Sequence, residues 1–232
     1  MTSIGLFGAS GRMGQAIAEV ACERDDVNIV EDDCDVLVDF SAPDGLRRHL
    51  EEAVEAGKPI VIGTTGLTPQ HHRLIDQAAE KIAVLQAANM SVGVNILVHL
   101  ARETAARLGP EWDIEIVEMH HRHKVDAPSG TALMLGKAAA DGRGVDLAQV
   151  SDRGRDGITG PRREGAIGFA ALRGGSVAGE HQLIFACDGE RVELGHRAES
   201  RTIFARGAVE AALWLTDKPA GRYSMADVLG LK

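Results

Sequence analysis

The chain has 232 residues, of which 44% are hydrophobic, and its formal net charge is -9. This length allows one large domain or two small ones, and the core must be mostly aliphatic because only 3% of the residues are aromatic. The negative charge argues against broad binding to nucleic acid or to an anionic membrane, since both need an excess of Lys and Arg.

The cysteines and the N-terminus favour a soluble cytoplasmic protein. The three cysteines are widely spaced, without a C-x-x-C pair, which is typical of reduced thiols rather than of disulfides or a zinc site. The N-terminus has neither the basic start nor the long apolar stretch of a signal peptide, and no run approaches the ~18 apolar residues of a membrane span.

The first element is a short apolar strand over residues 4–7. A glycine loop, G-A-S-G-R-M-G over residues 8–14, precedes a helical stretch at residues 15–22. This order predicts the phosphate-binding turn of a dinucleotide fold, because small residues allow close approach and the helix start faces the pyrophosphate. A purely structural tight turn remains the alternative.

Acidic residues follow the second predicted strand, residues 27–30. An acid at this position hydrogen-bonds the adenine-ribose hydroxyls in dinucleotide folds, and we expect Glu31 to take this role. A solvated turn is the alternative for each acid. Asp32 and Asp33 would repel the 2'-phosphate of NADPH, so we predict a preference for NADH, although Arg12 could still support NADPH.

Further strands at residues 35–40, 59–62 and 82–85 alternate with helices, as in a doubly wound sheet. Two loops follow the carboxyl ends of these strands, where such sheets bind ligands. They are G-T-T-G over residues 63–66 and A-A-N-M over residues 87–90. A simple glycine-rich strand exit is the alternative for the first loop.

The richest chemistry lies in residues 113–132, which read DIEIVEMHHRHKVDAPSGTA. A half-buried strand should deliver His120, His121 and His123 at its carboxyl end, with Lys124 directly after them. Ser129 and Thr131 are natural N-cap residues for a helix over residues 132–140. Amides at this helix start, with the charge of Lys124, suit a carboxylate or phosphate. The stretch is therefore interpreted as an anion site with proton donors.

The run E-I-V-E-M-H-H-R-H-K-V-D-A-P-S-G-T-A resembles the signature of the bacterial dihydrodipicolinate reductases of lysine and diaminopimelate biosynthesis. The glycine loop G-x-x-G-R-M-G and the segment A-A-N-M-S-V-G-V-N, with Met90 where phenylalanine is frequent, also resemble that family. The resemblance implies reduction of 4-hydroxy-tetrahydrodipicolinate by NADH or NADPH, with loss of water and without a metal. It places the proton chemistry on His120 and Lys124, either of which can be the final donor.

The resemblance also implies binding residues. It places substrate binding, for a small dicarboxylate, on His121, Gly130 and Thr131. It places cofactor contacts on Gly8, Ala9, Ser10, Gly11, Arg12, Met13, Gly63, Thr64, Thr65, Ala87, Ala88, Asn89 and Met90.

The expected architecture is α/β with two domains. A Rossmann-like, doubly wound dinucleotide-binding domain, shortened around residues 31–35, is expected over residues 1–91 and 202–232. Residues 92–201 should form an α+β substrate-binding and oligomerisation domain with a mixed sheet. Strands are predicted at residues 167–172, 180–186 and 191–194, and residues 143–161 should form a long loop with little regular structure. By resemblance, this second sheet should assemble a homotetramer.

The sequence also allows two other functions. His120, His121 and His123 with Glu118 could form a metal site for hydrolysis, but adjacent histidines on a strand point oppositely and Lys124 would repel a cation. A non-catalytic NAD(H)-binding sensor is the second alternative, and it would have no need of His120 or Lys124.

Overall fold

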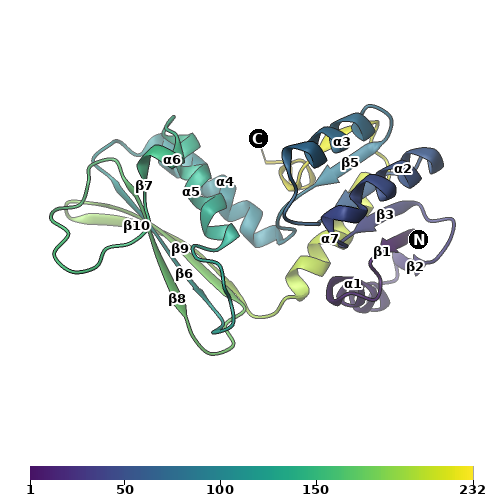
Figure 1. Cartoon of the computed structure of the whole chain (residues 1–232), viewed down its shortest axis with the longest axis horizontal. Helices are drawn as coiled ribbons and strands as arrows, with labels where there is room; N and C mark the ends of the chain where they lie inside the picture. The colour runs from purple at the N-terminus through teal and green to yellow at the C-terminus, as the bar shows by residue number, and fades with distance from the viewer. Residues whose placement is uncertain (232) are drawn as a thin grey trace. The chain divides into compact units, whose positions relative to one another are not determined.

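The computed structural model describes residues 1–231, and the chain divides into two compact units (Figure 1). Unit 1 consists of Met1–Val92 and Thr202–Lys232, and unit 2 consists of Gly93–Arg201. The helix α7 returns the chain to the first unit. Each unit has its own sheet and its own hydrophobic core.

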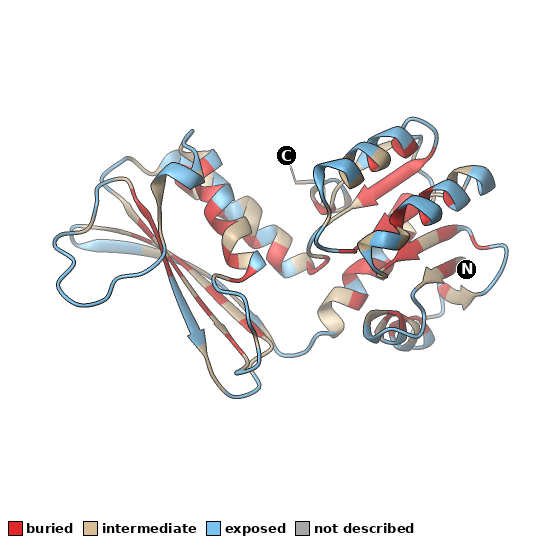
Figure 2. Cartoon of the chain, viewed as in Figure 1, coloured by how far each residue is buried: buried red, intermediate tan, exposed pale blue. Residues whose placement is uncertain are grey.

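Unit 1 is built on a six-stranded parallel sheet with the order β11-β5-β4-β3-β1-β2. The strands are β1 (Thr2–Phe7), β2 (Val27–Val30), β3 (Val36–Asp39), β4 (Ile60–Ile62), β5 (Ala83–Gln86) and β11 (Gly221–Tyr223). β4 is apolar throughout, and β3 and β5 are apolar up to their last residues, Asp39 and Gln86, because helices cover both faces of the sheet. Figure 2 shows these strands as largely buried.

The helices of unit 1 are α1 (Arg12–Cys22), α2 (Leu46–Ala56), α3 (Pro69–Ala79), α7 (Thr202–Leu215) and α8 (Met225–Val228), with a short 3-10 turn η1 (Pro43–Gly45) before α2. One core cluster joins α1 and α7 to the sheet, with Ile17, Val209 and Val38 among its buried members. A second cluster joins α2 and α3 to it, with Leu50 and Ile75 among its buried members. The predicted doubly wound arrangement is therefore confirmed.

The connection between β2 and β3 is unusually short. β1 lies between these two parallel strands in the sheet, and such strands are normally joined by a dozen or more residues, usually with a helix. Here residues 31–35 cross β1 at Gly5, where an added Cβ would lie 2.9 Å from Cys34 Sγ. Asp35 fixes the crossing because its carboxylate accepts hydrogen bonds from the amide and the hydroxyl of Ser3, at 2.7 and 2.8 Å.

Unit 2 contains a five-stranded sheet with the order β10-β9-β6-β8-β7. The sheet is mixed, as predicted. The strands are β6 (Asp113–His120), β7 (Ser151–Asp152), β8 (Ile167–Arg173), β9 (Gly179–Cys187) and β10 (Glu190–Ala198), and the helices are α4 (Val92–Arg107), α5 (Gly130–Gly142) and α6 (Leu147–Val150). β6 pairs parallel with β8 and antiparallel with β9.

The prediction of a long irregular loop over residues 143–161 is wrong in part. The segment contains α6, whose N-cap residue Asp146 accepts a hydrogen bond from the Ala148 amide at 3.0 Å. It also contains β7, which pairs with β8. The cap and the added edge strand supply backbone hydrogen bonds that the glycine-rich composition does not reveal.

Strand β6 positions the polar residues of unit 2. Its residues alternate in burial, and Ile114 and Ile116 are in the core beneath Leu135 of α5. Glu118 and His120 continue the same buried face toward the carboxyl end of the strand, because alternate residues of a strand share a face.

Candidate active site

The glycine loop after β1 leaves the start of α1 open to a ligand. Gly8 has a φ of +82°, and its carbonyl accepts a hydrogen bond from the Gly11 amide at 2.9 Å. A Cβ at Gly14 would lie 2.4 Å from the Gly8 carbonyl oxygen, so the loop and helix approach each other more closely than a side chain would allow. The predicted contacts from Gly8 to Arg12 are all exposed, and Met13 is partly buried. Bare amides at a helix start fit a pyrophosphate.

The other two predicted cofactor loops follow β4 and β5, at the same edge of the parallel sheet. Gly63 and Thr64 are buried, whereas Thr65 is exposed. Met90 is 1% exposed and belongs to the core of unit 1. Thr64 and Met90 are therefore buried, and the Met90 carbonyl packs closely against Gly207 of α7. The exposed parts of the two loops, at Thr65 and Ala88, are the ones accessible to a ligand. Ala87 and Asn89 are partly buried and Ala88 is exposed.

A buried polar cluster supports these loops, and the sequence analysis did not identify it. The Asp39 carboxylate, which is fully buried, accepts hydrogen bonds from His49 Nδ1 at 2.9 Å and from the Ser41 amide at 2.8 Å. The Thr64 hydroxyl also donates to it, at 3.3 Å. The His49 ring stacks on Phe7 with centroids 4.0 Å apart. The cluster therefore ties together the segments that leave β3 and β4.

The acid predicted to bind the ribose follows β2 and lies in the short crossing. Glu31, Asp32 and Asp33 are all exposed. Asp33 has a φ of 50°, which is uncommon for a residue other than glycine, and it forms an ion pair with Lys58 at 3.5 Å. An exposed acidic turn thus stands at the end of β2.

In unit 2, His120 is buried and held by a carboxylate on its own strand. His120 Nδ1 lies 2.5 Å from Glu118 Oε2. Desolvation raises the pKa of Glu118, but hydrogen bonds from Arg173 and His120 outweigh it, so the pKa falls below its ordinary value. Glu118 is therefore ionised at neutral pH and can only accept, which makes Nδ1 the donor and leaves Nε2 for proton exchange.

Lys124 follows in the turn after β6 and is 20% exposed at its side chain. Its ammonium donates to Asp126 Oδ1 at 2.8 Å, and this hydrogen bond is the main reason that the pKa of Asp126 is lowered. Arg173 donates to the backbone carbonyl of Asp126 at 2.6 Å while it also binds Glu118. His120 and Lys124 are therefore linked through Arg173.

His121 lies beside a pocket of about 760 Å³ lined by His121, Arg122, His123, Gly175, Ser176, Ala178 and Arg201. Arg201 Nη2 is 3.3 Å from His121 Nε2. Desolvation, followed by the charge of Arg201, lowers the pKa of His121. The pocket has cationic side chains on its wall and therefore suits an anion.

The three histidines do not gather into a metal site. His120 is buried against Glu118, whereas His121 and His123 face the pocket with their ring centroids 6.3 Å apart. Among residues 1–231, no group of three or more His, Cys, Asp or Glu side chains is arranged to hold a metal ion.

The predicted substrate residues Gly130 and Thr131 are the first two residues of α5, and the predicted N-cap Ser129 precedes them. The Ser129 hydroxyl accepts a hydrogen bond from the Ala132 amide at 3.2 Å, so this part of the prediction is confirmed. The same hydroxyl lies 3.0 Å from Nε2 of the buried His181. A Cβ added to Gly130 would meet nothing within 4 Å, so the helix start is accessible.

Several residues of this arrangement were missed by the sequence analysis. The alternation of β6 could have placed Glu118 beside His120, because they are two residues apart. Arg173, His181 and Arg201 come from distant segments, and no local pattern marks them.

A Rossmann-like unit with a glycine loop, joined to a second unit with a His-Lys cluster, defines a nucleotide-dependent oxidoreductase. Residues 25–90 match the profile of the N-terminus of dihydrodipicolinate reductase, and residues 93–229 match that of its C-terminus. The chain therefore belongs to the dihydrodipicolinate reductase family.

Individual proteins agree with this assignment. The 4-hydroxy-tetrahydrodipicolinate reductase of Zymomonas mobilis is 57% identical over 98% of this chain and 97% of its own length. That of Caulobacter vibrioides is 46% identical over 99% of this chain and 97% of its own. A dipicolinate-bound dihydrodipicolinate reductase from Paenisporosarcina sp. TG-14 shares the fold, with a TM-score of 0.77 and 21% identity over 98% of each chain.

Family membership identifies an oxidoreductase, rather than the hydrolase or the non-catalytic sensor that the sequence had left open. Within residues 1–231, no helix has the length and apolar character needed to cross a membrane.

Proposed function

We propose that this protein reduces 4-hydroxy-tetrahydrodipicolinate to tetrahydrodipicolinate, with loss of water, using NADH or NADPH in lysine and diaminopimelate biosynthesis. The observation that carries the proposal is the 57% identity with the Zymomonas mobilis reductase over nearly the whole chain. The reduced nicotinamide supplies the hydride when it is bound. Unit 1 binds the dinucleotide and unit 2 binds the substrate.

The proton chemistry is assigned to His120 and Lys124. Adding hydride to a conjugated imine builds negative charge, and a well-placed general acid accelerates such a step by ~100 to 10,000-fold. Nε2 is the ring nitrogen of His120 assigned to this purpose, since Nδ1 donates to Glu118. Lys124 brings a positive charge to the same turn and can stabilise the developing anion or donate a proton.

The substrate is a small dicarboxylate, as the dipicolinate found in the Paenisporosarcina structure also is. Its carboxylates are held by His121, Lys124 and the helix start at Gly130 and Thr131. Arg201, which lies 3.3 Å from His121, adds a further cation to this group. The accessible start of the 13-residue helix α5, whose N-cap residue Ser129 shares the Glu118 carboxylate with Arg173, supports this assignment.

The dinucleotide is held by the three loops that follow β1, β4 and β5. The fit of the first loop rests on Gly14, where a side chain would collide with the Gly8 carbonyl. We infer a preference for NADH, with Glu31 on the ribose hydroxyls, because the exposed Asp32 and Asp33 would repel a 2'-phosphate. Titration of the protein with each dinucleotide tests this inference, and tighter binding of NADPH would contradict it. Neutralising both aspartates as Asp32→Asn/Asp33→Asn should then improve NADPH binding more than NADH binding.

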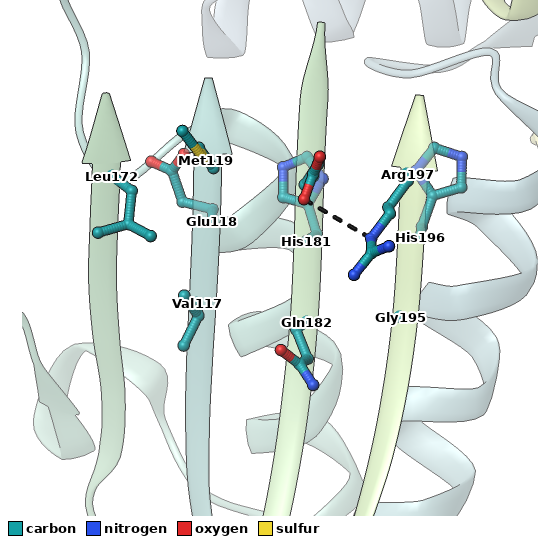
Figure 3. Close-up of a pocket in the computed structure, with 10 residues that line it drawn as sticks. Val117, Glu118, Met119, Leu172, His181, Gln182, Gly195, His196 and Arg197 are labelled. Atoms are coloured by element: carbon teal, nitrogen blue, oxygen red, sulfur yellow. Dashed lines mark ion pairs between the residues drawn. The ribbon is translucent and has the colours of Figure 1, made fainter. Parts of the chain in front are cut away.

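We further propose that the protein is a cytoplasmic homotetramer assembled through the sheet of unit 2. A pocket of about 400 Å³ lies on this sheet and is lined by residues of β6, β8, β9 and β10 (Figure 3). Leu172 on this sheet is 50% exposed, and Val117 and Met119 are partly buried beside it. Light scattering of the wild type and of Leu172→Asp tests the assembly, and a monomeric wild type would contradict it.

The reaction is tested by following the oxidation of NADH and of NADPH with 4-hydroxy-tetrahydrodipicolinate, generated enzymatically, as substrate. Lys124→Ala should lower kcat by ~100-fold or more while binding of the dinucleotide is kept, since the lysine belongs to unit 2. Lys137→Ala is the matched control, because Lys137 also pairs with an aspartate of unit 2 but lies on the exposed face of α5. No turnover by the wild type with either dinucleotide would contradict the proposed function.

A further inference from the structure

The Glu118 carboxylate receives four hydrogen bonds from three residues, although its side chain is only 1% exposed. Its Oε2 atom accepts from His120 Nδ1 at 2.5 Å and from Arg173 Nη1 at 2.8 Å. Its Oε1 atom accepts from the Ser129 amide at 3.1 Å and from Arg173 Nη2 at 2.8 Å. The Arg173 pair is therefore bidentate, which fixes the carboxylate in both position and orientation.

Each partner of Glu118 belongs to a different part of the proposed site. His120 ends β6, Ser129 caps the helix start that carries Gly130 and Thr131, and Arg173 ends β8. Arg173 also donates to the Asp126 carbonyl at 2.6 Å, and the Asp126 side chain holds Lys124. One buried ion pair thus connects the proton donors with the turn and helix that flank them.

We propose that Glu118 and Arg173 are positioning residues that hold His120 in one tautomer and fix Lys124 relative to it. This inference rests on the proposed function of His120 and Lys124. An ionised carboxylate can only accept a hydrogen bond, so it keeps a proton on Nδ1 and leaves Nε2 of His120 as the nitrogen that exchanges a proton with the substrate. The bidentate contact with Arg173 keeps that carboxylate ionised and in place after burial.

The substitution Glu118→Gln removes the carboxylate that positions His120, while the side chain keeps nearly the same shape. All four groups that face the carboxylate are donors, so an amide nitrogen cannot replace either oxygen without conflict. At the Oε1 position the amide nitrogen would face two other donors, the Ser129 amide and Arg173 Nη2. At the Oε2 position the amide nitrogen would face the donor Arg173 Nη1. It would also require His120 Nδ1 to accept a hydrogen bond, which moves the ring proton to Nε2. Loss of a tautomer-holding carboxylate costs up to ~10,000-fold in kcat in other enzymes.

The test compares Glu118→Gln with Glu115→Gln. Glu115 is on the same strand and also binds two arginines, Arg155 and Arg162, each at 2.8 Å, but it is on the opposite face. We expect kcat of Glu118→Gln to fall ~100-fold or more, whereas the dissociation constant of NADH changes little because the dinucleotide is assigned to unit 1. The solvent deuterium isotope effect on kcat should increase, because proton transfer becomes slower. Glu115→Gln should retain the wild-type kcat and isotope effect.

A second variant covers the case in which Glu118→Gln does not fold. Arg173→Lys keeps the charge but cannot bind both oxygens, so it should lower kcat less than Glu118→Gln while raising the isotope effect in the same direction. A folded Glu118→Gln protein with wild-type kcat would overturn the proposal, as would a loss of activity with an unchanged isotope effect in both variants. A wild type without turnover would instead contradict the proposed function itself.

Discussion

The buried His181 should make the stability of unit 2 depend on pH. The residue is 6% exposed on β9, beside Glu118 of β6 and His196 of β10 (Figure 3). Burial, followed by the charge of His120, lowers the pKa of His181 from 6.5 to about 4. A charged ring would also carry an N–H on Nδ1, which has no hydrogen-bond partner among the described residues.

The sign and size of the effect follow from this pKa. Below pH 6.5 the unfolded chain takes up a proton at His181, whereas the folded protein stays neutral down to about pH 4. The contribution of His181 to the free energy of unfolding is therefore fully present above pH 6.5 and is lost as the pH falls toward 4. The difference between the unfolded and folded pKa values of His181 corresponds to about 3 kcal/mol of unfolding free energy, of which about 2 kcal/mol is lost between pH 7 and pH 5. Most carboxylates remain ionised over that interval, so histidines dominate it.

Urea denaturation at pH 7 and pH 5 measures this loss. The chain has two tryptophans, and Trp214→Phe leaves Trp112 to report unfolding of unit 2. In that background, we expect the pH-dependent loss in free energy of unfolding to be about 2 kcal/mol smaller for His181→Gln than for His181. Gln182→Ala, on the opposite face of β9, should keep the full loss. An equal loss of unfolding free energy between pH 7 and pH 5 in His181→Gln and in its Trp214→Phe parent would refute the reasoning.

Three further substitutions test other parts of the structure. His49→Ala leaves the buried Asp39 carboxylate without its imidazole partner and should cost about 3 kcal/mol of unfolding free energy in urea titrations, whereas Arg47→Ala, 57% exposed on the same helix, should cost less than about 0.5 kcal/mol. Gly14→Ala places a methyl group 2.4 Å from a loop carbonyl and should introduce about 1–3 kcal/mol of strain, so weaker NADH binding is expected in calorimetric titrations. Ser129→Ala removes the N-cap of α5 and should lower the free energy of unfolding by about 1 kcal/mol, with Ser129→Thr restoring most of it.

Local patterns predicted much of the fold because they reflect short-range physical constraints. The strand at residues 27–30 has the predicted limits, because a short apolar run between polar turns is too short for a helix and favours a strand. The alternation of residues 114–119 also predicted a strand that delivers the histidines at its carboxyl end, and β6 does end at His120. The strand β11 and the helix α8 near the C-terminus were not predicted, because each is only three or four residues long and is stabilised by packing on unit 1.

The parts of the site that the sequence did not reveal depend on contacts between distant segments. Thr64 and Met90 lie in loops that fit a dinucleotide pattern, but the inward direction of their side chains is set by Asp39 and by the core of unit 1. Arg173 is separated from Glu118 by 55 residues. In a single sequence, a lone arginine at the end of a predicted strand has the same local pattern as an ordinary surface cation.

The position of Arg173 follows from the pairing of two strands rather than from any local motif. β6 and β8 are parallel, and their register places His120 opposite Arg173. Residues opposite each other in a parallel pair point to the same face, so the guanidinium reaches the face that carries Glu118 and His120. A slip of one residue would turn Arg173 to the other face and leave a buried carboxylate without its cation, at a cost of about 3–5 kcal/mol. The apolar residues Ile114 and Ile116, which lie on the buried face of β6, penalise the same slip. Core packing upstream and the ion pair downstream therefore enforce one register, and that register assembles the proposed proton-transfer site.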